Sequence, residues 1–198
     1  MRNKIIITIG RQNGSGGRYI GEKLANTLGI NCYDDELINE LAKKYGIDIE
    51  EVKKNDEQLP ENTFYFGGQL IPAKIFNIQA SLIKKIAQEE SCIFIGRAAD
   101  YILRDEENLV TVFVHAPLGS RIERYSRRNN ISVIEAEKMI TRQDKKRANY
   151  YKFYTNQIWG DAKNYHLSID TSKVGIDGAV KLIEEYINFI SDNNNIIK

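Results

Sequence analysis

The chain has 198 residues, of which 42% are hydrophobic and 28% charged, as is ordinary for one globular domain with a buried core. Its formal net charge of +1 gives no overall attraction to nucleic acid or to an anionic membrane surface. Since no apolar run approaches the ~20 residues of a membrane helix and two cysteines form no disulfide framework, we expect a cytoplasmic protein without a membrane partner.

The first part of the chain predicts strands that alternate with helices. Residues 4–9, KIIITI, form a β-branched run that is typical of a strand buried on both faces. A helix follows the next glycines, because apolar residues recur every four positions up to Leu28 and Gly29 then ends it. Residues 30–36, INCYDDE, predict a short second strand that closes on acidic residues.

Three more strands and a final helix complete the pattern. The strands are predicted at residues 90–97, 109–116 and 165–172. One apolar stripe marks the last helix, formed by Ala179, Leu182, Ile183, Tyr186, Ile187 and Ile190. Alternating strands and helices predict an α/β fold, with a five-stranded parallel sheet between two layers of helices, in a single domain over residues 1–198.

The stretch IGRQNGSGGRYIGEKLA, residues 9–25, has the outline of a phosphate-binding loop. A glycine-rich turn between a strand and a helix directs backbone N–H groups and the positive helix end at one point. Gly14, Ser15, Gly16 and Gly17 supply this turn. We therefore expect them to bind phosphate through the backbone.

Two other interpretations of the glycine turn remain. One is a tight turn without a ligand. The other is a dinucleotide site, since Gly10 and Gly14 loosely fit that pattern, but these two glycines lack the Gly-x-Gly spacing and only Asp34 and Asp35 could supply the acidic residue. The position between a strand and a helix favours the phosphate loop.

Two arginines flank the glycines, although the loop has no lysine. Arg18 follows them directly, and its long, forked side chain can fold back over phosphate oxygens. Arg11 precedes the glycines and is the second candidate. We expect both to bind phosphate and Arg18 to act in catalysis.

Polar residues end two of the predicted strands, at the sheet edge where ligands bind in this architecture. Arg97 ends one strand and is predicted to contact phosphate or base, a buried salt bridge being the alternative. Asp34 and Asp35 end another, where they could orient Mg²⁺-bound water or accept hydrogen bonds from an acceptor molecule. Capping the next helix is their alternative role. No residue is predicted as a direct metal ligand.

Residues 121–152 form a basic stretch, with ten Lys or Arg against four Asp or Glu. Such charge suits a lid that closes on a triphosphate and swings away for release. A solvated basic face is the alternative, and nucleic acid is not an expected partner. The residues assigned to the lid are Arg121, Arg124, Arg128, Arg142, Asp144 and Arg147.

These segments occur in a recognisable order. The glycine loop, YDDELI, IFIGRAADYIL, the basic stretch and YHLSIDTSKVGIDGAV together resemble the cytidylate kinase-like proteins, relatives of bacterial cytidylate kinase. The resemblance extends from Lys4 to about Ile190. It implies a three-layer P-loop nucleoside monophosphate kinase fold, with an acceptor-binding insertion at residues 33–90 and a mobile helical lid at residues 117–163.

The loop and the acceptor site depart from the family's motifs. GSGG at residues 14–17 lies on the kinases' GSGK, which puts Gly17 in the lysine's place and Arg18 in that of the hydroxyl residue that holds Mg²⁺. Arg97 matches the arginine that grips the acceptor phosphate. Ala98 stands where cytidylate kinases have a base-reading aspartate.

The remaining motifs agree in part. YDDELINE corresponds to the kinases' LDTGAxYR, so Asp34 agrees while Glu40 replaces a phosphate-gripping arginine. Asp144 and Arg147 match the Asp-x-x-Arg of the lid, and Arg142 resembles a displaced second lid arginine.

The resemblance implies ATP- and Mg²⁺-dependent phosphoryl transfer to a nucleoside monophosphate or a related small phosphate acceptor. Arg18, Asp34 and Arg147 are the expected catalytic residues, and Arg97, Asp34 and Asp35 the acceptor-binding ones. The alternative, which Gly17 favours, is a nucleotide-binding regulatory module that has lost catalysis. Small nucleotides are the expected partners, and a homo-oligomer is left open.

Overall fold

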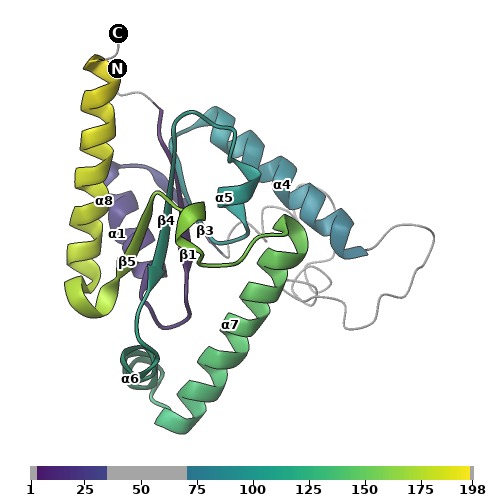
Figure 1. Ribbon diagram of the computed structural model, residues 1–198, viewed down its shortest axis with the longest axis vertical. Coiled ribbons are helices and arrows are strands. Elements are labelled where there is room, and N and C mark those ends of the chain that lie inside the picture. Colours follow the sequence, from purple (N-terminus) through teal and green to yellow (C-terminus); the bar gives the residue numbers. More distant parts are fainter. Residues whose placement is uncertain (1–3, 35–70, 197–198) are drawn as a thin grey trace.

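The computed structural model describes residues 4–34 and 71–196. Within them, five strands form one parallel sheet in the order β2-β3-β1-β4-β5 (Figure 1). The strands are β1 Ile6–Arg11, β2 Asn31–Tyr33, β3 Cys92–Ile95, β4 Leu109–His115 and β5 Leu167–Asp170. This arrangement confirms the predicted α/β fold with a five-stranded parallel sheet.

Helices cover both faces of the sheet, as predicted. In Figure 1, α1 and α8 lie on one face and α4 and α5 on the other, while α6 and α7 extend beyond the carboxyl ends of the strands. The helices are α1 Gly17–Leu28, α4 Ile71–Glu89, α5 Ala99–Ile102, α6 Leu118–Asn129, α7 Val133–Thr155 and α8 Thr171–Ile196, with a 3₁₀ turn at Ala162–Asn164.

The central strand β1 shows why its sequence is a continuous apolar run. Ile7 and Ile9 pack into the core cluster shared with α1 and α8, whereas Ile6 packs into the cluster with α4 and α5. All three side chains are fully buried. Since burying one such side chain stabilises the fold by about 1.5–3 kcal/mol, both faces of this strand are held firmly.

The strand predictions hold, although the first strand begins and ends two residues later than predicted and the other four are shorter. The second strand is the clearest difference, since it has three residues and ends at Tyr33, directly before Asp34. Most of the predicted insertion at residues 33–90, including Asp35 and Glu40, lies outside the described residues. Among the described helices, none combines the length and the apolar character needed to cross a bilayer.

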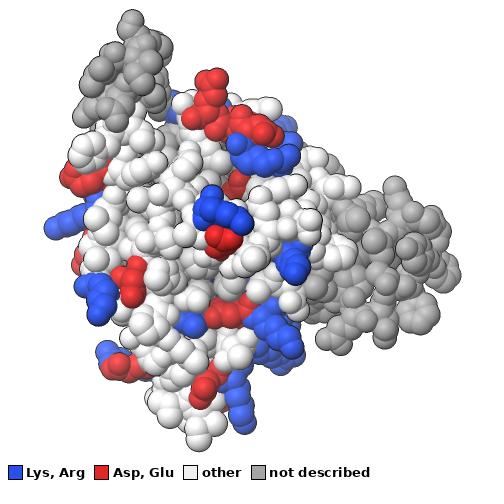
Figure 2. Space-filling view, viewed as in Figure 1, with Lys and Arg blue, Asp and Glu red and all other residues white. Residues whose placement is uncertain are grey.

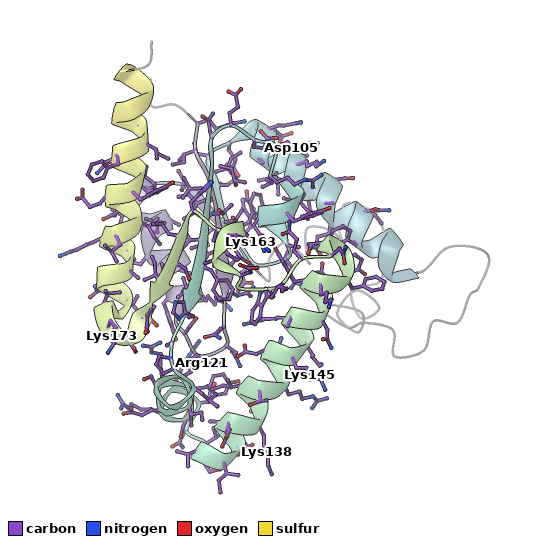
Figure 3. The ribbon with its side chains drawn as sticks, in the orientation of Figure 1. Asp105, Arg121, Lys138, Lys145, Lys163 and Lys173 are labelled. Carbon is purple, nitrogen blue, oxygen red and sulfur yellow. The ribbon has the colours of Figure 1, made fainter. Side chains whose placement is uncertain are left out.

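Charges of both signs are scattered over the face shown in Figure 2, and blue side chains are prominent over the lower part, where α7 runs. Figure 3 shows that Lys138 and Lys145 project from α7, whereas Arg121 lies where α6 approaches the sheet. The basic stretch therefore contains both outward-facing cations and cations directed at the sheet edge.

Candidate active site

The glycine loop connects the end of β1 to the start of α1. Gly14 and Gly16 have positive φ angles of 77° and 92°, which strain any residue with a side chain. The buried Ser15 hydroxyl donates a hydrogen bond to the Gln12 carbonyl over 2.8 Å, so this side chain shapes the loop. Because α1 begins at Gly17, its first N–H groups have no intrahelical acceptor and face the space in front of the loop.

Two residues assigned to the lid hold the other side of the loop. The Asp144 carboxylate accepts the Asn13 N–H over 2.7 Å and pairs with Arg121 Nη1 over 2.6 Å. Arg121 also donates to the Asn13 carbonyl, over 3.0 Å, and to the Ala116 carbonyl, over 2.9 Å. The Arg121 side chain is only 8% exposed. Arg121 and Asp144 therefore join α6, α7 and the loop into one buried network.

Thr171 fixes the loop to the start of α8. Its hydroxyl donates to the Ser15 carbonyl over 2.7 Å and accepts from Arg124 Nη1 over 3.3 Å. Arg124 Nη1 also donates to the Gly14 carbonyl over 3.0 Å. Thr171 falls at the end of the strand predicted at residues 165–172, and sequence reasoning did not assign it this role. The signal available was its position at the carboxyl end of a parallel strand.

The loop faces a pocket of about 200 Å³ at the carboxyl edge of the sheet. Four elements, β1, α1, α6 and α7, contribute arginines to its lining, namely Arg11, Arg18, Arg124, Arg128 and Arg147. The glycines and Asp34 also line it. Arg142 is exposed on α7 and is not among the residues that line this pocket.

Ion pairs orient the side chains near the carboxylate of Asp34. Arg11 Nη2 lies 3.3 Å from Asp34 Oδ1, and both side chains are 11% exposed. Arg18 Nε lies 3.8 Å from Asp34 Oδ2 and 2.8 Å from Glu22 Oε1, with the Arg18 side chain 49% exposed. Arg147 Nη1 donates to the Arg11 carbonyl over 3.2 Å. The structure thus brings together the three expected catalytic residues, Arg18, Asp34 and Arg147.

Arg97 lies at a second, smaller cavity of about 20 Å³. Gly96, Arg97 and Ala98 have successive positive φ angles of 77°, 60° and 53°. Gln79 Nε2 donates to the Arg97 carbonyl over 3.2 Å, and the Arg97 side chain is buried. Arg147 lines both cavities, so the predicted acceptor site adjoins the loop pocket.

A buried carboxyl group, which sequence reasoning missed, lies in the same small cavity. Asp100 Oδ2 accepts a hydrogen bond from the Tyr151 hydroxyl over 2.6 Å. Burial raises the pKa of the Asp100 carboxyl, and the hydrogen bond from Tyr151 partly opposes that shift. Tyr165, Arg97 and Arg147 line this cavity as well. No local pattern pointed to this pair, because Asp100 and Tyr151 are 51 residues apart along the chain.

We expect Asp100→Asn to change how stability depends on pH. The raised pKa of Asp100 means that the folded state holds this proton to higher pH than the unfolded state, where an aspartate titrates near ~3.9. Stability is therefore lost as the pH rises through the folded pKa. Urea unfolding at pH 4 and pH 7 should show the variant gaining stability relative to the wild type at pH 7. Parallel stability curves for the two proteins would contradict this.

Comparisons with known proteins show the family to which the chain belongs. The model of the cytidylate kinase-like family matches residues 6–173. A cytidylate kinase from Saccharolobus islandicus (strain Y.G.57.14) is 29% identical over 196 residues, 98% of this chain and 96% of that protein. A cytidylate kinase from Pyrococcus horikoshii is 27% identical over 191 residues, 96% of this chain and 91% of that protein.

Solved structures show the same fold. An uncharacterised protein from Eubacterium ventriosum ATCC 27560 is 30% identical, with a TM-score of 0.76 over 93% of this chain and 99% of that one. A gluconokinase from Sinorhizobium meliloti 1021 has a TM-score of 0.60 at 15% identity, over 100% of this chain and 99% of that one, and shares the fold alone. Since the family match spans most of the residues, this chain belongs to the cytidylate kinase-like family.

Proposed function

We propose that this protein transfers the γ-phosphoryl group of ATP to a nucleoside monophosphate or a related small phosphate acceptor. The observation that carries the proposal is the pocket in which arginines from β1, α1, α6 and α7 meet the N-terminal end of α1. In this reaction an acceptor oxygen bonds to the γ-phosphorus as the bond to the β–γ bridging oxygen breaks. Catalysis consists mainly of positioning and of neutralising phosphate charge, which is what such a pocket can supply.

The residues divide into two groups under this proposal. The loop N–H groups and the arginines of the larger pocket bind the triphosphate, while Arg97 in the adjoining cavity binds the acceptor phosphate. Arg147 contributes to both cavities and would stabilise the charge that develops between them. Residues 117–163 would act as the lid, which is supported by the contacts of Arg121, Arg124 and Asp144 with the loop.

The pocket fits Mg²⁺ brought in with the nucleotide. Arg18 stands where the family has a hydroxyl ligand, and the described residues contain no cluster of three or more metal-binding side chains. Mg²⁺ is usually held by one or two carboxylates together with substrate phosphates and water. Asp34 is the carboxylate that lines the pocket, so it would hold the ion, directly or through water. The ion would neutralise charge on the phosphate oxygens.

A nucleotide-binding regulatory module is the second candidate, because Gly17 replaces the loop lysine. A coupled assay of ADP release over a panel of nucleoside monophosphates and nucleosides separates the two, when run beside a calorimetric titration with ATP. ADP release that depends on an acceptor supports the kinase. Tight ATP binding without acceptor-dependent ADP release contradicts it and supports the module.

We expect weak discrimination between CMP and UMP. Ala98 is buried at the small cavity beside Arg97 and has no side chain that could accept a hydrogen bond from the amino group of cytosine. A missing partner of this kind is worth about 1–3 kcal/mol, or roughly 5- to 150-fold. Steady-state kinetics should therefore give a kcat/KM ratio below about 5 for CMP over UMP.

The matched variant is Ala98→Asp, which supplies the missing acceptor. Aspartate tolerates the positive φ of 53° at this position better than most residues do, so the backbone should accept it. The CMP preference should rise about tenfold in this variant. A wild-type enzyme that already prefers CMP a hundredfold would contradict our assignment of the base site.

A further inference from the structure

Compared with the usual phosphate loop, this loop has its cation and its first glycine in exchanged positions. The usual phosphate loop is G-x-x-x-x-G-K-[ST], with a glycine six residues before the lysine. In this chain Gly17 takes the lysine's position, and six residues earlier Arg11 takes that of the first glycine. One residue on each side of the loop therefore departs from the pattern. A large, charged residue replaces the glycine at position 11, and a glycine replaces the large, charged lysine at position 17.

The structure shows that these two departures depend on each other. A Cβ atom built at Gly17 would lie 2.5 Å from Arg11 Cβ and 3.0 Å from its Cγ. A Cβ atom at Gly96 would lie 1.7 Å from Arg11 Nη1. The Arg11 side chain thus passes directly over the α-carbons of two glycines, and neither position could hold a larger residue while Arg11 keeps this conformation.

The charged end of Arg11 lies at both cavities, since Arg11 lines the loop pocket and the smaller cavity beside Gly96. Its guanidinium lies beside Asp34, and the two side chains line the pocket together with Gly17. The Arg147 side chain donates to the Arg11 carbonyl, which fixes the backbone from which this arginine starts. Arg11 is therefore a largely buried and positioned cation at the loop.

Arg18, the other candidate, is placed differently. Its side chain is half exposed and extends along the surface of α1 toward Glu22, with Nε and Oε1 2.8 Å apart. It also lines the pocket, but it holds a partner four residues along its own helix. The Arg11 side chain is less exposed than that of Arg18, and it passes over Gly17. The geometry therefore favours Arg11 as the cation closest to the lysine's usual place.

We propose that Arg11 binds the β- and γ-phosphate oxygens of the nucleotide in place of the loop lysine, and that residue 17 is a glycine because Cβ and Cγ of Arg11 occupy the space above it. This inference rests on the proposed function, since it assigns a role within the same phosphate site. The cation reaches the nucleotide from the strand side of the loop instead of the helix side.

The test is a double-mutant cycle read by calorimetric ATP binding and by thermal unfolding. Arg11→Gly should weaken ATP binding about tenfold or more, because it removes the cation. Gly17→Lys should also weaken it and lower the melting temperature, because the new side chain collides with Arg11. The double variant Arg11→Gly/Gly17→Lys restores the usual pattern and should bind ATP within about threefold of the wild type.

A second double variant makes the test specific to the contact. In Arg11→Ala/Gly17→Lys the clash at Cβ persists, so binding should not recover. Recovery in both double variants, or in neither, would overturn the proposal. So would unchanged ATP binding by Arg11→Gly beside a tenfold loss in Arg18→Ala, which would give the role to Arg18. A wild-type protein that fails to bind ATP would instead contradict the proposed function.

Discussion

Replacing Asp144 with alanine is expected to damage both the fold and the activity. Asp144 is the shared acceptor for the Asn13 N–H and for the buried guanidinium of Arg121. Without it, the Arg121 guanidinium, which is 8% exposed, keeps its two carbonyl acceptors but loses its carboxylate partner, and breaking a buried ion pair costs about 3–5 kcal/mol. Because Asp144 is itself 17% exposed, we expect the lower end, about 3 kcal/mol.

The activity should fall because the loop loses an anchor. Asn13 directly precedes the glycines, and a displacement of about 1 Å at a reacting group can cost ~100-fold in rate. We therefore expect kcat/KM for ATP to fall by about two orders of magnitude. Urea unfolding and steady-state kinetics measure the two effects.

Two further variants separate the network from a general loss of charge. Asp144→Asn keeps an acceptor for the Asn13 N–H but loses the ion pair, so its losses should be intermediate. Glu137→Ala removes an exposed carboxylate from the same helix and should change stability by less than about 0.5 kcal/mol. Equal stability of Asp144→Ala and Glu137→Ala would show that the contacts of Asp144 with Asn13 and Arg121 contribute nothing to stability.

The strands and the order of elements could be predicted from the sequence because their signals are local. Apolar β-branched runs such as residues 4–9 occur where a strand is buried on both faces, and Ile6 and Ile7 do pack into opposite clusters. The glycine turn between a strand and a helix is likewise a local signal, and its positive φ angles at Gly14 and Gly16 agree with it.

The contacts between distant segments could not be predicted in this way. Asn13 and Asp144 are 131 residues apart, and no periodicity relates them. The sequence favoured Arg18 over Arg11, because Arg18 directly follows the glycines. The lower exposure of the Arg11 side chain and its path over Gly17 favour Arg11 instead. The sequence analysis assigned Arg121 and Asp144 to a lid, but it did not predict their shared contacts with the loop.

Replacing Arg97 is expected to abolish most of the turnover while leaving ATP binding within about threefold of the wild type. Under the proposed function Arg97 binds the acceptor phosphate, and it lines the small cavity and not the loop pocket. Losing one positioned donor to developing charge costs about 10²–10³-fold. Kinetics with the best acceptor of the panel, beside ATP calorimetry, should show this division. Arg97→Lys should recover little, because an ammonium cannot form the forked pair.

The backbone of Arg97 allows the functional and structural interpretations to be separated. Its φ of 60° is left-handed, which costs a residue with a side chain about 1–2 kcal/mol relative to glycine. If the side chain is retained for the acceptor, Arg97→Gly should be about 1 kcal/mol more stable than Arg97→Ala, while both lose turnover equally. Arg104→Ala, which removes a half-exposed arginine nearby in the sequence, serves as the surface control and should retain full turnover. If Arg97 instead serves only as a buried structural cation, both variants should unfold more easily yet keep the wild-type KM for the acceptor, and the acceptor-site assignment would then be wrong.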